Sequence, residues 1–227
     1  MNALVLAGGK GTRLASVVYD VPKPLAPING TPFLTILLDN LFSKGIDSVV
    51  LSVGYKADII INEFKNNTRI RFSIESAPLL TGGAIKKGLS NFCRDSYVLI
   101  VNGDTFVNVD YDKLIQFHIA HDADITVACP LLHNFDRYGT VAVDSDDKIL
   151  QFKEKEKKHI GLINGGVYCL RASFADNFNS DIFSFEKWLE DNCLKYKIMC
   201  YRGVSDFIDI GVPADYFRAQ SIFAEMK

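Results

Sequence analysis

The sequence predicts an α/β fold in which helices cover both faces of a largely parallel sheet. Through the first half of the chain, short apolar runs alternate with stretches of helical periodicity, as in successive β-α-β units. The 227 residues are 48% hydrophobic, which is enough to build a core without disulfides or metals. Because no linker, internal repeat or low-complexity segment interrupts the chain, we expect residues 1–227 to form a single domain.

The first half carries the regular part of this pattern. Apolar runs predict strands at residues 3–7, 48–53, 70–75 and 97–101. Helical periodicity between them predicts helices at residues 32–43, 56–64 and 81–89. Thr31 and Pro32 offer an N-cap and a first-turn proline, so they predict where the first helix begins.

The second half is less regular. Its periodicity predicts helices at residues 111–121, 184–194 and 213–224. Strands are predicted at residues 124–129, 140–144, 149–153, 165–170 and 197–201. We therefore expect an α/β half followed by a half of mixed topology.

Charge and cysteine usage narrow the class of protein. The formal net charge is −2 and no basic patch is evident, so nucleic acids are not expected partners. The five cysteines form no CxxC pair and are odd in number, which indicates reduced thiols and a cytosolic setting. The apolar run at residues 3–7 is too short for a signal-peptide core, and no later run could span a bilayer. We expect a cytoplasmic protein without a membrane partner.

The stretch AGGKGTRL, residues 7–14, follows the first predicted strand and combines bare backbone with positive charge. Glycines let backbone N–H groups turn toward one point, and Lys10 and Arg13 add charge there, which suits a polyphosphate. A P-loop would need Ser or Thr after Gly-Lys, but Gly11 follows Lys10. A dinucleotide fingerprint would need a glycine where Leu14 stands. A glycine-rich surface turn is the alternative.

Extended to LAGGKGTRL followed by PKPLAPI, this stretch resembles the signature of the sugar-1-phosphate nucleotidyltransferases, also called NDP-sugar pyrophosphorylases. The resemblance implies a Rossmann-like three-layer α/β fold with a mostly parallel, mixed central sheet, of the GT-A-like nucleotide-diphospho-sugar transferase class. It also implies two catalytic residues, with Arg13 on the β and γ phosphates of a nucleoside triphosphate and Lys23 near the α phosphate. The prolines on both sides of Lys23 stiffen its segment.

A base-binding loop is implied at LLTGGA, residues 79–84, although Leu80 stands where the family usually has glycine. Glu75 ends the strand before this loop, and its carboxylate could accept hydrogen bonds from N1–H and N2–H₂ of guanine; a solvated glutamate is the alternative. The full nucleotide-binding set that we expect is Leu6, Ala7, Gly8, Gly9, Gly11, Thr12, Arg13, Lys23, Glu75, Thr81, Gly82, Gly83, Asn102 and Gly103.

Two aspartates are candidate ligands of Mg²⁺. Asp104 in the turn NGDT resembles the family's metal ligand, and Asp209 in FIDIGVP matches the second aspartate. Magnesium binds proteins through one or two carboxylates and completes its shell with phosphate oxygens and water. The alternatives are that Asp104 only opens a turn and that Asp209 only caps the last helix.

The second half of the chain is expected to bind the sugar phosphate. By resemblance, Glu154 and Asn164 contact sugar hydroxyls, Gly139 and Gly165 offer backbone contacts, and Lys155 binds the sugar phosphate. Glu156 departs from the proline that is frequent in the family. Without the resemblance, KEKEKK would be interpreted as a solvated charge run.

No general base is needed in such a reaction, because a sugar 1-phosphate is already an anionic nucleophile. The histidines show no triad or metal-binding spacing, and the first two are expected at the surface or at a helix end; they are His118, His121, His133 and His159. The cysteines likewise have no identifiable catalytic partner.

Motifs along nearly the whole chain, among them VPKPLAPING, TGGAIK, INGGVY and DIGVPADYFRAQ, resemble those of D-glycero-α-D-manno-heptose 1-phosphate guanylyltransferases. That resemblance implies GTP and a heptose 1-phosphate as substrates, with GDP-heptose made for bacterial surface polysaccharide. A UTP-, CTP- or dTTP-dependent hexose 1-phosphate enzyme, a non-catalytic nucleotide-sugar-binding regulatory homologue and, more remotely, a nicotinamide oxidoreductase are the alternatives. The oligomeric state, a homodimer included, is left open.

Overall fold

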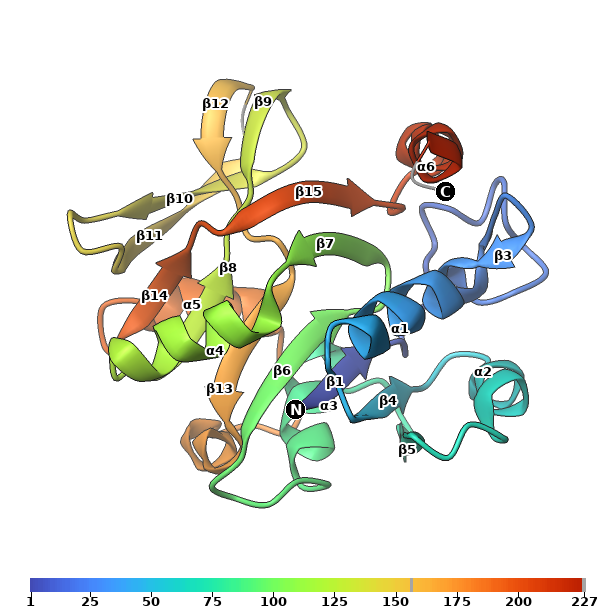
Figure 1. The fold of residues 1–227 in the computed structure, drawn as a ribbon, viewed down its shortest axis with the longest axis horizontal. Coiled ribbons are helices and arrows are strands. Elements are labelled where there is room, and N and C mark those ends of the chain that lie inside the picture. The colour runs from blue at the N-terminus through green and yellow to red at the C-terminus, as the bar shows by residue number, and fades with distance from the viewer. Residues whose placement is uncertain (156, 226–227) are drawn as a thin grey trace.

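The computed structural model describes residues 1–155 and 157–225, and it confirms the predicted α/β fold (Figure 1). A seven-stranded sheet forms its centre, in the order β14-β8-β13-β6-β1-β4-β5. β13 runs antiparallel to both of its neighbours, whereas the other neighbouring pairs are parallel. The strands are β1 (Asn2–Leu6), β4 (Ser48–Val53), β5 (Ile70–Ile74), β6 (Tyr97–Asn102), β8 (Ile125–Ala128), β13 (Val167–Arg171) and β14 (Ile198–Tyr201).

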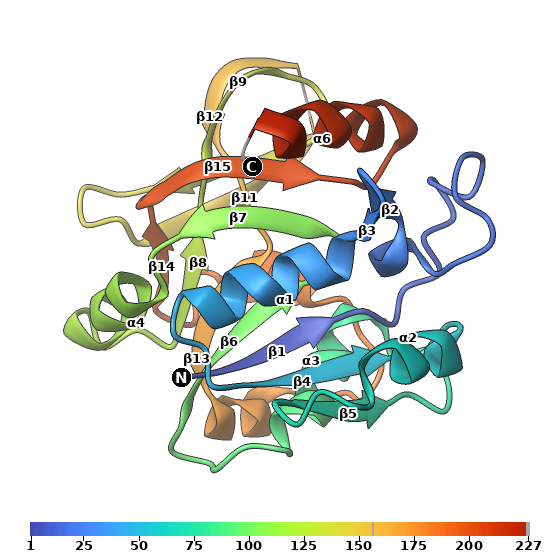
Figure 2. The same cartoon turned by 45° about the vertical axis from the view of Figure 1, so that its right-hand side comes forward.

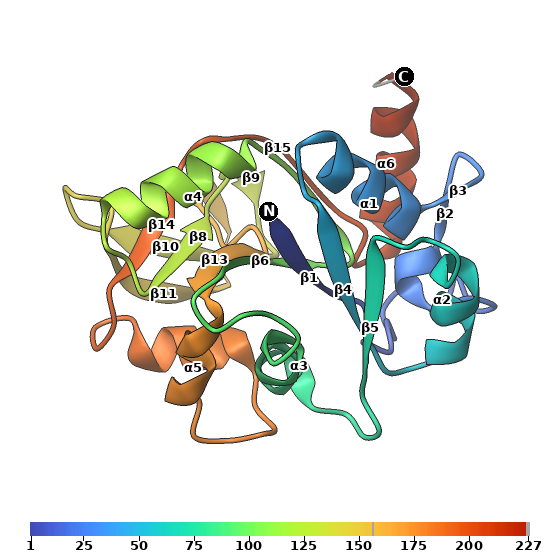
Figure 3. The same cartoon turned by 60° about the horizontal axis from the view of Figure 1, so that its bottom comes forward.

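Helices cover the two faces of this sheet (Figure 3). One face packs against α1 (Phe33–Ser43), α2 (Ala57–Phe64) and α4 (Tyr111–Ala120). The other packs against α3 (Leu80–Leu89), α5 (Phe185–Asn192) and the 3-10 segment η2 (Ala172–Asn177). Strand β1 shows the two-residue alternation that serves both layers, because Ala3 and Val5 belong to the first core cluster and Leu4 to the second.

Two-stranded antiparallel ribbons complete the fold. β7 (Thr105–Val109) pairs with β15 (Val204–Asp209), and Figure 2 shows α6 (Pro213–Glu225) lying along this ribbon. Phe106, Ile208 and Tyr216 form a third core cluster there. The other ribbons join β10 (Gly139–Val143) to β11 (Ile149–Lys155), β9 (Leu131–Phe135) to β12 (Lys158–Leu162), and β2 (Pro27–Ile28) to β3 (Thr31–Pro32).

The predicted start of the first helix is wrong. Thr31 and Pro32 form strand β3, and α1 begins at Phe33 without a side-chain cap. Asn29 and Gly30 both have positive φ, 48° and 84°, which is the geometry of a tight hairpin turn between β2 and β3. Thr31 and Pro32, which the sequence pattern assigns to the start of the helix, are extended residues of this hairpin instead.

His118 lies at a helix end, one of the two positions that the sequence predicts for it. It lies in the last turn of α4, but it is buried rather than at the surface, and its Nδ1 lies 2.9 Å from the hydroxyl of Thr126. All five cysteines are free thiols, four of them buried and Cys93 exposed. Among the described residues, no helix has the combination of length and apolar character needed to cross a bilayer.

Candidate active site

The site forms where the parallel strands β1, β4 and β6 end. Leu6 lies opposite Ser52 on one side and Asn102 on the other, so the loops that follow these strands emerge side by side. Two adjoining cavities open there, of about 860 Å³ and about 540 Å³. After the ligands that the sequence predicts for them, the larger is named the nucleotide cavity and the smaller the acceptor cavity. Both are lined by Arg13, Asn102, Asp104, Ser184 and Glu186.

The glycine loop lines the nucleotide cavity and depends on two close approaches. A Cβ on Gly11, whose φ is +60°, would lie 2.5 Å from the Cβ of Lys23. A Cβ on Gly8 would lie 2.5 Å from Oε1 of Glu75. Bare backbone is therefore required for the loop to lie against Lys23 on one side and Glu75 on the other.

Lys23 is buried in the 3-10 segment η1 (Lys23–Leu25), between two buried prolines. Its Nζ donates to Oδ2 of Asp104 over 2.5 Å. The stiff segment aims the ammonium group at the carboxylate on the border of the two cavities.

Asp104 and Asp209 come together because β7 pairs with β15. Thr105 lies opposite Asp209 in this ribbon, and the amide of Ile210 donates to the carbonyl of Asp104. Asp209 accepts hydrogen bonds from the Gly211 amide (2.6 Å) and from the Tyr138 hydroxyl (3.2 Å). Burial, and after it the charge of Asp104, raise the pKa of the Asp209 carboxyl. The negative charge of Asp104 thus disfavours ionisation of Asp209.

This donor set fits Mg²⁺. The ion takes oxygen ligands and uses one or two protein carboxylates beside phosphate oxygens, and a cation here would relieve the repulsion that raises the pKa of Asp209. Within residues 1–155 and 157–225, no cluster of three or more His, Cys, Asp or Glu side chains forms a cage that would hold a metal without a substrate.

The base loop follows β5. Glu75 lines the nucleotide cavity, its Oε1 accepting from the Ser52 hydroxyl and its Oε2 from the Leu79 amide, each over 3.2 Å. Leu80 has a φ of +61° and an exposed side chain in the same cavity. It keeps the left-handed backbone that a glycine would adopt more easily.

Most of the expected nucleotide-binding residues line this cavity; those that do are Leu6, Gly8, Gly9, Gly11, Thr12, Arg13, Lys23, Glu75, Thr81 and Asn102. Ala7, Gly82, Gly83 and Gly103 do not line it and are buried behind it. The last three are packing glycines, because a Cβ would meet the Phe183 ring at 2.2 Å, the Asp181 carbonyl at 2.1 Å and the Leu6 carbonyl at 2.5 Å, respectively.

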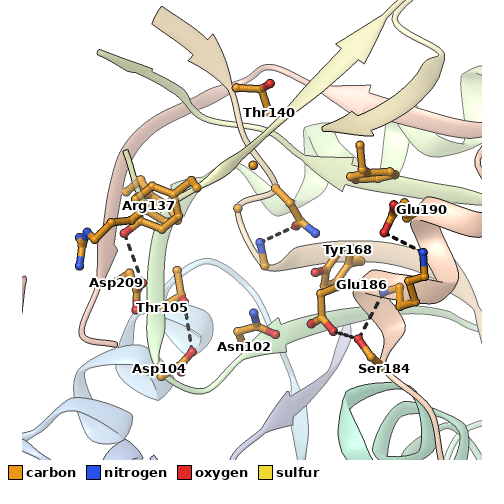
Figure 4. Close-up of a pocket in the computed structure, with 18 of the residues that line it drawn as sticks. Asn102, Asp104, Thr105, Arg137, Thr140, Tyr168, Ser184, Glu186, Glu190 and Asp209 are labelled. Carbon is orange, nitrogen blue, oxygen red and sulfur yellow. Dashed lines mark hydrogen bonds and ion pairs between the residues drawn. The ribbon is translucent and has the colours of Figure 1, made fainter. Parts of the chain in front are cut away.

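The acceptor cavity, part of whose lining is shown in Figure 4, contains Gly139, Asn164 and Gly165 from the expected sugar-phosphate set. Asn164 is oriented by the hydrogen bond that its Oδ1 accepts from the Gly166 amide. Glu154 and Lys155 belong to strand β11, next to the cavity residues Phe152 and Lys153, but their side chains lie outside the described part of the structure.

Several residues at these cavities escaped the sequence analysis. Arg137 lines the acceptor cavity, forms an ion pair with Asp215 and lies over the ring of Tyr138. Its place two residues before Gly139, an expected sugar-phosphate contact, is a sequence signal that could have pointed to it. Ser184 and Glu186 belong to the motif FSFEK, residues 183–187, which is another of those that resemble the family, but the motif assigns them no role in the site. The packing of α5 on α3 brings them to the two cavities.

The comparisons with known proteins decide the family. The model of the family described as nucleotidyl transferase matches residues 2–225. The chain belongs to this family. A nucleotidyl transferase fold of this kind also occurs in a crystal structure of HddC from Yersinia pseudotuberculosis complexed with GMP-PN. That structure has a TM-score of 0.86 and 36% identity, and the match covers 98% of this chain and 99% of that one.

Two curated relatives of this nucleotidyl transferase are both named D-glycero-alpha-D-manno-heptose 1-phosphate guanylyltransferase. The protein from Campylobacter jejuni is 44% identical over 96% of this chain and 97% of its own length. The protein from Aneurinibacillus thermoaerophilus is 44% identical over 97% of both chains. The family resemblance stated from the sequence motifs is thereby confirmed.

Proposed function

We propose that this nucleotidyl transferase joins GTP and D-glycero-α-D-manno-heptose 1-phosphate to form GDP-heptose and pyrophosphate. The observation that carries the proposal is the meeting of two cavities at Arg13 and Asp104, which gives two phosphorylated substrates a shared boundary. The names of two relatives that are 44% identical over nearly the whole chain support the choice of substrates.

The chemistry needs positioning and charge neutralisation. An oxygen of the sugar phosphate attacks the α phosphorus of GTP, a new P–O bond forms, and the bond to the bridging oxygen of pyrophosphate breaks. The nucleophile is already an anion, so no side chain has to remove a proton. Arg13 at the cavity border would stabilise the β and γ phosphates, and Lys23 would stabilise the charge that develops at the α phosphate.

Asp104 and Asp209 would hold Mg²⁺, which when bound supplies positive charge to the triphosphate and the leaving group. Asp209 ends β15 and Asp104 immediately precedes β7, so the pairing of these strands would hold the two aspartates together at the cation. Lys23 would remain beside the reacting phosphates because its buried segment leaves it little freedom.

Guanine is favoured by Glu75. Ser52 and Leu79 orient its carboxylate, and each oxygen keeps lone-pair capacity for a further hydrogen bond. N1–H and N2–H₂ of guanine present two donors side by side, whereas uracil and thymine present one ring N–H. A relative crystallised with GMP-PN also supports a guanine nucleotide.

The setting of the reaction stays a prediction. We infer a cytoplasmic enzyme whose product is used for a bacterial surface polysaccharide, such as a capsule, an S-layer glycan or lipopolysaccharide. Its dependence on Mg²⁺ also stays a prediction, and a homodimer stays one alternative.

The test is a substrate panel. The purified protein is incubated with Mg²⁺, inorganic pyrophosphatase and each of GTP, ATP, CTP, UTP and dTTP, against several sugar 1-phosphates including the manno-heptose, and phosphate release is followed. We expect release with GTP and the heptose 1-phosphate. Turnover with only a different base or acceptor would contradict the proposed substrates, and nucleotide-sugar binding without turnover would favour a regulatory homologue.

A further inference from the structure

Glu186 occupies an unusual place on the border between the two cavities. It lies in the first turn of α5, its side chain is exposed, and it lines both the nucleotide cavity and the acceptor cavity. Figure 4 shows its carboxylate near Tyr168, with the hydroxyl of Ser184 hydrogen-bonded to it. A charged group at such a border is in reach of substrate atoms.

One of the two oxygens of this carboxylate, Oε2, is held by hydrogen bonds within the protein. Oε2 accepts from the Thr81 hydroxyl over 2.6 Å and from the Ser184 hydroxyl over 2.7 Å. The Thr81 oxygen itself accepts from the Phe185 amide over 2.9 Å, so its own proton is directed at Glu186. Among the described side chains and backbone, Oε1 receives no hydrogen bond and is available for a ligand.

A helix-capping role does not explain this arrangement. The N-cap of α5 is Ser184, whose side chain accepts from the Lys187 amide over 3.2 Å. Within the described residues, the Glu186 carboxylate accepts from hydroxyl groups and not from the backbone amides that a cap would satisfy. Its negative charge is favourable near a helix N-terminus, but that benefit does not require two hydroxyls to orient it.

The Glu186 carboxylate lies close to a residue of the acceptor cavity. The pKa of the Tyr168 phenol is raised first by burial and then by the charge of Glu186, so the two groups are close. Of the two cavities, Tyr168 lines only the acceptor cavity, together with Asn164, one of the expected sugar contacts. A carboxylate repels phosphate but accepts well from hydroxyl groups.

We propose that Oε1 of Glu186 accepts hydrogen bonds from hydroxyl groups of the acceptor sugar, and that Thr81 positions it. Thr81 lies in the first turn of α3 and within the predicted base-binding loop, so one hydrogen bond connects the nucleotide side of the site to the recognition of the sugar. This inference rests on the proposed function and adds a residue that selects the acceptor.

The test compares steady-state kinetics of four variants. Glu186→Ala should lower kcat/KM for the sugar phosphate about 10- to 100-fold, mainly through KM, and leave KM for GTP nearly unchanged. Thr81→Val should raise KM for the sugar phosphate more weakly, and Thr81→Ser, which keeps the hydroxyl, should leave that KM unchanged; because Thr81 also lines the nucleotide cavity, KM for GTP is compared only for Glu186→Ala. Asp191→Asn is the matched control, because Asp191 lies on the same helix and pairs with Lys187 but lines neither cavity.

Deoxy analogues of the sugar phosphate give the second readout. With the unaltered protein, removing the hydroxyl that Glu186 binds should cost about 10- to 100-fold in kcat/KM, and in Glu186→Ala that penalty should disappear. A rise in KM for GTP instead, absent for 2′-deoxy-GTP, would overturn the assignment and place Glu186 on the ribose. Kinetics of Glu186→Ala equal to those of the unaltered protein would overturn it outright. Failure of the unaltered protein to form any nucleotide sugar would contradict the proposed function itself.

Discussion

The Nζ of Lys23 lies 2.5 Å from Oδ2 of Asp104, and this ion pair joins the proline-flanked segment η1 to the end of strand β6. The lysine is 8% exposed and the aspartate 36%, so water screens the lysine poorly. A buried cation beside a carboxylate that also faces both cavities is held ready for an anionic substrate.

Replacing Lys23 with methionine should therefore abolish most of the turnover. We expect kcat to fall about 100-fold or more, because a preorganised charge at the reacting phosphate is lost. Steady-state kinetics with saturating GTP and sugar phosphate measure this. Lys65→Met is the control, because Lys65 is exposed and, among the described residues, its Nζ bonds only to Asn62. Equal kcat values for both variants would remove Lys23 from the reaction.

Asp209→Asn should separate stability from activity. The pKa of Asp209 is raised by burial and by the charge of Asp104, so ionising this group costs the folded state free energy once the pH exceeds the unfolded value. We expect the variant to melt at a higher temperature than the parent at pH 8, with the difference shrinking as the pH falls. Turnover with Mg²⁺ should drop about 100-fold or more. Unchanged turnover would contradict the metal assignment.

His118 should make the fold sensitive to acid. Burial, and after it the charge of Arg171, lower its pKa to about 4, while nearby Asp122 and Asp124 act in the opposite direction. A lowered histidine pKa means that the unfolded chain binds the proton first, so stability is complete above pH 6.5 and is lost as the pH falls toward 4. The loss is about 3 kcal/mol by linkage. Urea unfolding across this range should show it, and His118→Gln should flatten the pH dependence, whereas His133→Gln, at an exposed position, should not.

Gly83→Ala should destabilise the contact between α3 and the segment before α5. A Cβ at position 83 would lie 2.1 Å from the Asp181 carbonyl, which is backbone and cannot turn away. We expect a loss of about 1–3 kcal/mol in the free energy of unfolding. Gly9→Ala is the control for stability, since a Cβ there meets nothing within 4 Å. Equal denaturation midpoints for the two variants would show that the segment moves aside freely.

The regular half of the fold could be predicted because its signals are local. Apolar runs such as residues 48–53 become strands of the central sheet, the glycine loop follows β1, and Asp104 lies in the turn after β6. The β7–β15 ribbon could not be predicted, since its strands pair across about a hundred residues and β15 mixes polar and apolar side chains. Its contribution to the site is large, because it brings Asp209 to Asp104.

The remaining differences between the predicted and the observed site arise from the packing of helices. Gly82 and Gly83 belong to a recognisable loop motif, yet they serve the approach of α3 to Phe183 and Asp181. Glu186 reaches the site only through that same approach, by its hydrogen bond with Thr81. Sequence spacing does not encode a contact between two helices that lie about a hundred residues apart.

Guanylyl transfer can be observed directly by ³¹P NMR of the protein mixed with Mg²⁺, GTP and D-glycero-α-D-manno-heptose 1-phosphate. We expect the resonances of GTP and the sugar phosphate to be replaced by the coupled pair of a nucleoside diphosphate sugar together with an equal amount of pyrophosphate. Conversion of GTP to GDP and orthophosphate, with the sugar phosphate unchanged, would contradict guanylyl transfer as the function of this protein.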